Sequence, residues 1–134
     1  MKSFFQKKGA SIILLILISI EIFYVSSLSF GPGPGMITIV PFTYHVIVFF
    51  LFSFFTLNLI CSENKFSQMI LSIILSLICA ILDEVHQIFV PFRGAGAEDI
   101  LIDSLGIFSA AIFFLISRNY SRILKLSPIF RGRR

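Results

Sequence analysis

Residues 82–106 read LDEVHQIFVPFRGAGAEDILIDSLG and hold five of the seven acidic residues of the chain, one of its two histidines and a single arginine. Apolar runs long enough to cross a bilayer lie on both sides of this segment. Charged side chains are costly inside a membrane and tend to mark functional positions there. The segment therefore fixes both the expected fold and the expected site.

Composition defines the class of protein. Of the 134 residues, 57% are hydrophobic, 17 are phenylalanine and only 13% are charged, which lies outside the range of soluble domains. We predict one integral membrane domain over residues 1–134, with the phenylalanines facing lipid. The basic residues are segregated along the chain and form no patch for nucleic acid, and the sequence requires no cofactor.

Four apolar runs, at about 10–28, 40–61, 67–90 and 98–117, each reach the ~20 residues that a membrane helix needs. They predict an all-α bundle of four transmembrane helices, separated by a Gly-Pro-rich loop at 30–37, a polar turn at 61–66 and a loop around Arg93. A basic tail is expected over 118–134. The lysines before the first run also suit a signal peptide, but Glu21 within the run favours a membrane helix.

The basic residues predict the orientation. With four spans, ten of the eleven lysines and arginines fall on the side of the two termini, and only Arg93 falls opposite. The positive-inside rule then places both termini in the cytoplasm. We expect the membrane to be the plasma membrane. The polar residues of the segment 82–106 would lie in the outer half of the bilayer.

Helical spacing predicts which side chains meet. The third run carries one small-and-polar face, and the fourth run carries another: Ser72, Ser76, Cys79, Asp83, His86 and Gln87 on the third, and Asp99, Asp103, Gly106 and Ala110 on the fourth. A short loop joins the two faces, and His45 begins the second run at the same level. We expect one hydrated, outward-facing pocket whose candidate catalytic or binding residues are His45, Asp83, Glu84, His86, Gln87, Arg93, Asp99 and Asp103.

The charge balance of this pocket leaves alternatives open. Six carboxylates face one arginine and two histidines, so some carboxyls are protonated, a divalent cation binds, or a cationic ligand completes the site. Asp83 and His86 suit either a metal or an interhelical hydrogen bond. Glu21 suits a proton carrier or a partner of His45, and Arg93 suits an anionic ligand or neutralisation of Asp99 or Glu84. Cys61 and Cys79 lie too far apart along their helices for a disulfide.

The segment resembles the VanZ-like family of membrane proteins. Residues 83–89 match the family pattern Asp-Glu-x-His-Gln-x-Phe, Pro91 and Arg93 match its Pro-Gly-Arg, and residues 99–106 match its Asp-x-x-x-Asn-x-x-Gly. Weaker similarity covers residues 22–27 and His45. Phe92 replaces the family glycine and Asp103 the family asparagine, while Pro41 and Phe42 replace an Asp-Lys pair. These changes make the site more acidic than the family pattern.

The resemblance implies a function at the cell surface, because the best-known members of this family are associated with low-level resistance to the glycopeptide teicoplanin. Three hypotheses follow. In the first, the pocket binds a lipid-linked or amphiphilic, glycopeptide-like envelope ligand. In the second, the protein is a membrane-embedded hydrolase or transferase for a lipid or envelope precursor, with His45 or His86 as general base. In the third, the cluster only specifies helix packing. The sequence indicates membrane lipid as a partner and no oligomeric state.

Overall fold

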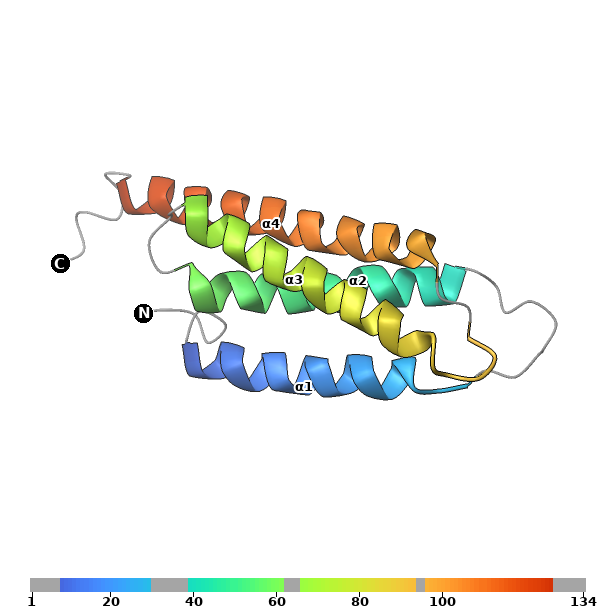
Figure 1. The fold of residues 1–134 in the computed structure, drawn as a ribbon. Coiled ribbons are helices and arrows are strands. Elements are labelled where there is room, and N and C mark those ends of the chain that lie inside the picture. Colours follow the sequence, from blue (N-terminus) through green and yellow to red (C-terminus); the bar gives the residue numbers. More distant parts are fainter. Residues whose placement is uncertain (1–7, 30–38, 62–65, 94–95, 127–134) are drawn as a thin grey trace.

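The computed structural model describes residues 8–29, 39–61, 66–93 and 96–126, with the side chains of 39–41 and 121–126 left out of the description. Its four helices are α1 (Lys8–Ser26), α2 (Ile39–Ile60), α3 (Phe66–Gln87) and α4 (Ala97–Leu126). All four are long and apolar enough to cross a membrane. The predicted all-α, four-span membrane bundle is therefore confirmed (Figure 1).

Two helix ends differ from the expected ones by three residues or more, and the others differ by one or two. α3 ends at Gln87 rather than Val90, because turn hydrogen bonds replace the helical ones before Pro91. Phe89 N donates to His86 O and Val90 N donates to Gln87 O, both at 3.0 Å. The residue before a proline is disfavoured in a helix. α4 continues to Leu126 rather than ending near residue 117, since nothing before Pro128 breaks it. The loop at 30–37, the turn around Glu63 and the tail beyond Leu126 lie outside the described residues.

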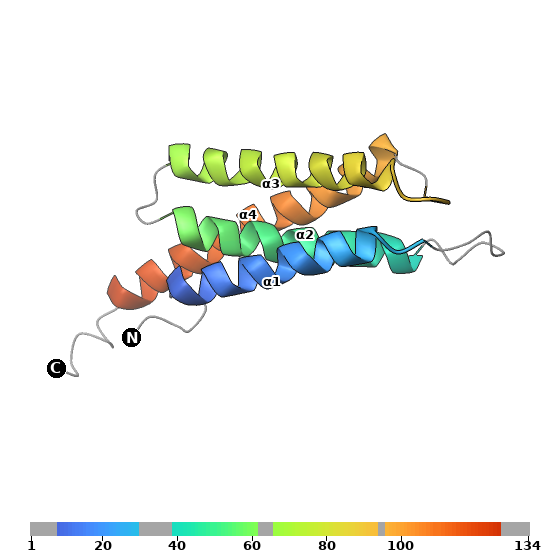
Figure 2. The ribbon, with the colours of Figure 1, turned by 60° about the horizontal axis from the view of Figure 1, so that its bottom comes forward.

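α2 is the central helix and packs against each of the other three. The beginning of α1 and the end of α4 lie at one end of the bundle, which we call the terminal end (Figure 1). The opposite end, where α3 ends and α4 begins, we call the cluster end. Figure 2 shows α4 crossing α2 obliquely, with α1 and α3 on separate sides of α2. This arrangement brings parts of all four helices to the cluster end.

α4 approaches the backbone of α2 closely at Gly106. A Cβ placed on Gly106 would lie 3.0 Å from the backbone nitrogen of Phe50 and 3.2 Å from the carbonyl carbon of Val46, so a side chain has no room. Ala110, one turn along, is also fully buried. Small residues allow this close packing of helices in lipid. The buried small-residue face expected for the fourth span is thus present.

Most of the surface of each helix remains apolar and exposed, as a lipid-facing bundle requires. The expectation that the phenylalanines face lipid is only partly right. Phe49 is fully buried in the core, and Phe55 and Phe114 are nearly so. These rings fill the interior because the small residues of α3 and α4 leave space against α2.

Candidate functional site

The imidazole of His45 and the carboxylate of Asp103 form the most deeply buried polar pair at the cluster end. Nδ1 of His45 lies 2.9 Å from Oδ1 of Asp103, and the side chains are 6% and 1% exposed. α2 supplies the imidazole and α4 the carboxylate. The sequence suggested Glu21 as a partner of His45; the structure pairs His45 with Asp103 instead, because the close contact at Gly106 draws α4 against α2. An ionised Asp103 would accept the Nδ1–H proton and leave Nε2 as the free ring nitrogen.

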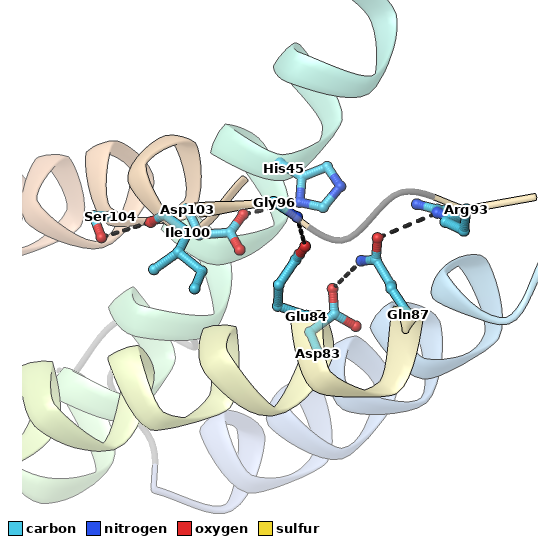
Figure 3. A network of polar contacts seen from close by, with 9 residues as sticks. All are labelled: His45, Asp83, Glu84, Gln87, Arg93, Gly96, Ile100, Asp103 and Ser104. Atoms are coloured by element: carbon cyan, nitrogen blue, oxygen red, sulfur yellow. Dashed lines mark hydrogen bonds and ion pairs between the residues drawn. The ribbon is translucent and has the colours of Figure 1, made fainter. Parts of the chain in front are cut away.

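A second polar chain runs from α3 into the following loop (Figure 3). Gln87 donates from Nε2 to Oδ2 of Asp83 at 2.8 Å, and its Oε1 accepts from Nε of Arg93 at 3.3 Å. Gln87 is 1% exposed, and Asp83 is also buried. The amide of Gln87 therefore links the buried carboxylate of Asp83 on α3 to the guanidinium of Arg93, which lies in the loop after α3.

Arg93 also connects this chain to α1. Its Nη1 donates to the carbonyl oxygens of Val25 at 3.1 Å and Leu28 at 3.4 Å, at the end of α1. The turn before it accounts for this direction: Pro91 is followed by Phe92 with a φ of 62°, and Arg93 N donates to Val90 O at 3.2 Å. Proline followed by a residue of positive φ is typical of a type II turn. The left-handed conformation at Phe92 explains why a glycine suits this position in the family pattern.

Glu84 closes the loop on its other side. It is buried on α3, and its Oε1 accepts a hydrogen bond from the backbone nitrogen of Gly96, immediately before α4 (Figure 3). Asp99 in the first turn of α4 is half-buried and Glu98 is exposed. Negative charge at a helix N-terminus is favourable, which accounts for both positions. The structure thus brings together Asp83, Glu84, Gln87 and Arg93 on one element pair and His45 with Asp103 on another.

His86 takes a different direction from the one expected. Its Nε2 lies 3.0 Å from the hydroxyl of Ser27, and its ring lies 4.6 Å from the ring of Phe23, both at the end of α1. The buried face of α3 consists of Ser72, Ser76, Ala80, Asp83, Glu84 and Gln87. Cys79 and His86, expected on this face, are half-buried at its edge. The six residues expected on the face are spread between positions 72 and 87, and at their spacings they cover a broad sector of the helix rather than one narrow side. His86 therefore joins α3 to α1.

Tyr44 was not among the predicted site residues. It precedes His45 on α2, and its ring meets that of His45 edge-on at 5.8 Å. Its hydroxyl oxygen is buried, and no hydrogen-bond partner lies within reach among the described residues. A polar tip one position before a candidate histidine, inside an apolar run, was the available sequence signal. Glu21, the other polar side chain suggested as a partner of His45, lies on α1 and is exposed.

The described residues form no metal centre, and a groove in the bundle is largely apolar. No three histidine, cysteine or acidic side chains within it are placed to hold a metal ion. A groove of about 430 Å³ lies between α1, α2 and α3. Seven of its nine lining residues are leucine, isoleucine or phenylalanine, and the other two are Ser19 and Thr56. The polar groups of the cluster end are instead joined to one another by hydrogen bonds.

Four membrane helices and a buried acid–imidazole cluster at one end define a class of small multi-pass membrane protein. Comparison with known families makes this specific: the VanZ/LLP1 family matches residues 4–118. The chain therefore belongs to the VanZ/LLP1 family. Comparison with curated proteins gave no match, and comparison with solved structures gave none either.

Proposed function

We propose that this protein resides in the plasma membrane with both termini in the cytoplasm, and that its cluster end faces outward and binds the polar head of a lipid-linked or amphiphilic envelope ligand. The observation that carries the proposal is the burial of His45, Asp83, Glu84 and Asp103, each no more than 7% exposed, within apolar membrane helices. Ionisable groups in such segments are costly to keep and commonly serve binding or transport. The chain belongs to the VanZ/LLP1 family, and the association of the best-known VanZ-like members with teicoplanin resistance supports a role at the cell envelope.

Arg93 and the carboxylates divide the binding work. Arg93 is half-buried and carries the positive charge of the loop at the cluster end, so it suits an anionic group of the ligand. Asp83 and Asp99 suit an amine or a hydroxyl of the same head. Because Gln87 joins Asp83 to Arg93, a ligand that displaces one contact would affect both.

The experiment compares two matched acid-to-amide substitutions. Asp83→Asn replaces a buried carboxyl group, and Glu98→Gln replaces an exposed one at the same end of the bundle. Each variant is expressed in a teicoplanin-sensitive bacterium, and the purified proteins are titrated with teicoplanin in nanodiscs. We expect Asp83→Asn to lose protection and at least tenfold in affinity while unfolding like the parent, and Glu98→Gln to retain both.

Two outcomes would contradict the binding proposal. If Asp83→Asn and Arg93→Ala fold and bind teicoplanin as the parent does, the cluster has no part in binding. If Asp83→Asn, His86→Ala and Arg93→Ala all fail to fold in detergent, the cluster serves helix packing.

A fusion of alkaline phosphatase to the C-terminus tests the orientation, since this reporter should be inactive if the tail is cytoplasmic.

A catalytic role is the second candidate, and the geometry of His45 favours it. A carboxylate hydrogen-bonded to Nδ1 orients the ring and leaves Nε2 to accept a proton, as a general base requires. Water would be the nucleophile in hydrolysis of a lipid or envelope precursor. Turnover of a fluorescent phospholipid that is abolished in His45→Gln but retained in His86→Gln would support this role. No turnover by the parent protein would exclude it for that substrate.

A further inference from the structure

The Tyr44 hydroxyl is a buried polar group that the bundle leaves unsatisfied. No described residue offers it a hydrogen bond. Tyr44 packs against a core cluster that includes Ile22 of α1 and Ala80 of α3, so its side chain lies where these two helices meet α2. Buried phenols normally have a hydrogen-bond partner. An oxygen supplied from outside the chain would satisfy this one.

The apolar groove lies between the same three helices, nearer the middle of the bundle. Leu15, Phe52 and Leu75 contribute to its wall from α1, α2 and α3. The wall also contains two hydroxyl residues, but Ser19 donates to the carbonyl of Leu15 at 2.7 Å and Thr56 to that of Phe52 at 2.8 Å. Both hydroxyl donors of the groove are therefore satisfied, and the rest of the wall offers water no polar group.

The groove and the phenol lie along one row of α2. Tyr44 and the groove residues Phe52, Thr56 and Ile60 are multiples of four residues apart, so they fall in a single inclined row on the helix surface. At ~1.5 Å per residue, Phe52 lies about 12 Å along α2 from Tyr44, toward the terminal end. A molecule with an oxygen-bearing head at Tyr44 and an apolar chain extending along α2 would occupy both.

The chemistry of the groove selects its occupant. The protein spans a membrane, where hydrocarbon chains are the surrounding solvent. Helices that pack together in lipid use small residues to bring their backbones close, whereas the groove contains no glycine or alanine and is lined, apart from Ser19 and Thr56, by leucine, isoleucine and phenylalanine. A narrow hydrocarbon chain fits such a wall better than a partner helix does.

We propose that the groove between α1, α2 and α3 holds one hydrocarbon chain of a membrane lipid, and that the Tyr44 hydroxyl donates a hydrogen bond to an oxygen in the head of the same molecule. This inference rests on the proposed function, in which the ligand is lipid-linked or amphiphilic, and it assigns the side of the bundle from which that ligand binds. The contacts of His86 with Ser27 and Phe23 join α1 to α3 at this side. Their side chains would turn aside to admit the head.

The test uses phosphatidylglycerol with a diazirine at the end of one acyl chain, incorporated into nanodiscs with the full-length protein. Mass spectrometry identifies the residues labelled after irradiation. We expect labels on the groove residues of α1, α2 and α3 in preference to exposed residues of α4 such as Ile112 and Ile116. Labels spread evenly over the exposed residues of all four helices would overturn the proposal.

Two pairs of variants separate the chain site from the head contact. Leu75→Trp fills the groove and should reduce its labelling at least tenfold, whereas Leu71→Trp, on the exposed surface of α3 outside the groove, should not. Tyr44→Phe removes only the hydroxyl and should weaken labelling about fivefold, the effect of one net hydrogen bond. Tyr24→Phe, at an exposed position of α1, is its control. Equal labelling in Leu75→Trp and Leu71→Trp would exclude the groove.

The two proposals fail in different ways. If the groove is not labelled but Asp83→Asn still weakens teicoplanin binding, the polar site remains and the hydrocarbon groove is wrong. If the groove is labelled as expected while Asp83→Asn binds normally, the groove remains and the polar site is wrong. A dimer in nanodiscs that Leu75→Trp dissociates would show that a second copy of the chain fills the groove, and would overturn the inference.

Discussion

His45 on α2 and Asp103 on α4 are 58 residues apart in sequence, and their side chains meet at 2.9 Å with almost no exposure. Loss of either partner leaves the other buried without its hydrogen bond, at a cost of about 1–3 kcal/mol. We expect His45→Ala to lower the free energy of unfolding in detergent by this amount. Asp103→Asn should lose less, because the amide oxygen still accepts from Nδ1. A loss in His45→Ala no greater than in Ser109→Ala, at an exposed position of α4, would contradict the pairing.

Gly106 sets the spacing of α2 and α4. A methyl group at this position meets the backbone of Val46 and Phe50, which cannot rotate away as a side chain can. We expect Gly106→Ala to lower the free energy of unfolding by about 1–3 kcal/mol, as overpacking does. Gly9→Ala is the control, since no atom lies within 4 Å of its added Cβ. Equal stability of the two variants would show that the helices are further apart than described.

Phe92 occupies a backbone conformation that favours glycine. Its φ of 62° is costly for a residue with a Cβ, and its side chain is 75% exposed. Phe89 is similarly exposed, at 78%. We expect the free energy of unfolding of Phe92→Gly to exceed that of Phe89→Gly by about 1 kcal/mol. Both variants lose similar apolar contact, but only Phe92→Gly relieves the strained φ. A Phe92→Gly protein less stable than Phe89→Gly would mean that the Phe92 ring is more important than its backbone.

Two arginines connect helices through hydrogen bonds at opposite ends of the bundle. Arg93 donates to the carbonyls of Val25 and Leu28 at the cluster end, and Arg118 donates to that of Cys61 at 2.9 Å at the terminal end. We expect Arg93→Ala to increase hydrogen exchange at the end of α1, and Arg118→Ala to increase it only at the end of α2. Mass spectrometry of protein in nanodiscs measures both. Identical exchange patterns in the two variants would contradict these assignments.

Cys61 follows α2 and is buried beside Ser72. Burial raises the pKa of its thiol above the usual value. A higher pKa means less of the reactive thiolate near neutral pH, so alkylation should be slow and should accelerate only at higher pH than for an exposed thiol. The measurement is maleimide labelling of Cys79→Ser in detergent, with the unfolded protein as the reference. Labelling of the folded protein at the unfolded rate would show that Cys61 is accessible.

The apolar runs and the distribution of charge determined the number of helices and the position of the acidic cluster, because a span must satisfy every backbone group internally and cannot easily hold ions. The resemblance around residues 83–106 likewise identified the family. Local sequence also indicated the small-residue packing of α4 at Gly106 and Ala110. These features depend on neighbours in sequence or on the membrane itself.

Only the tertiary structure decided the partners. His45 pairs with Asp103 rather than Glu21, and His86 turns to Ser27 on α1, because helix rotation and crossing depend on which small residues meet. Helical periodicity places a side chain within a broad sector, and a side chain at the edge of that sector faces either of two neighbouring helices. The positive φ at Phe92 and the unsatisfied hydroxyl of Tyr44 depend on the same packing, which brings distant segments together.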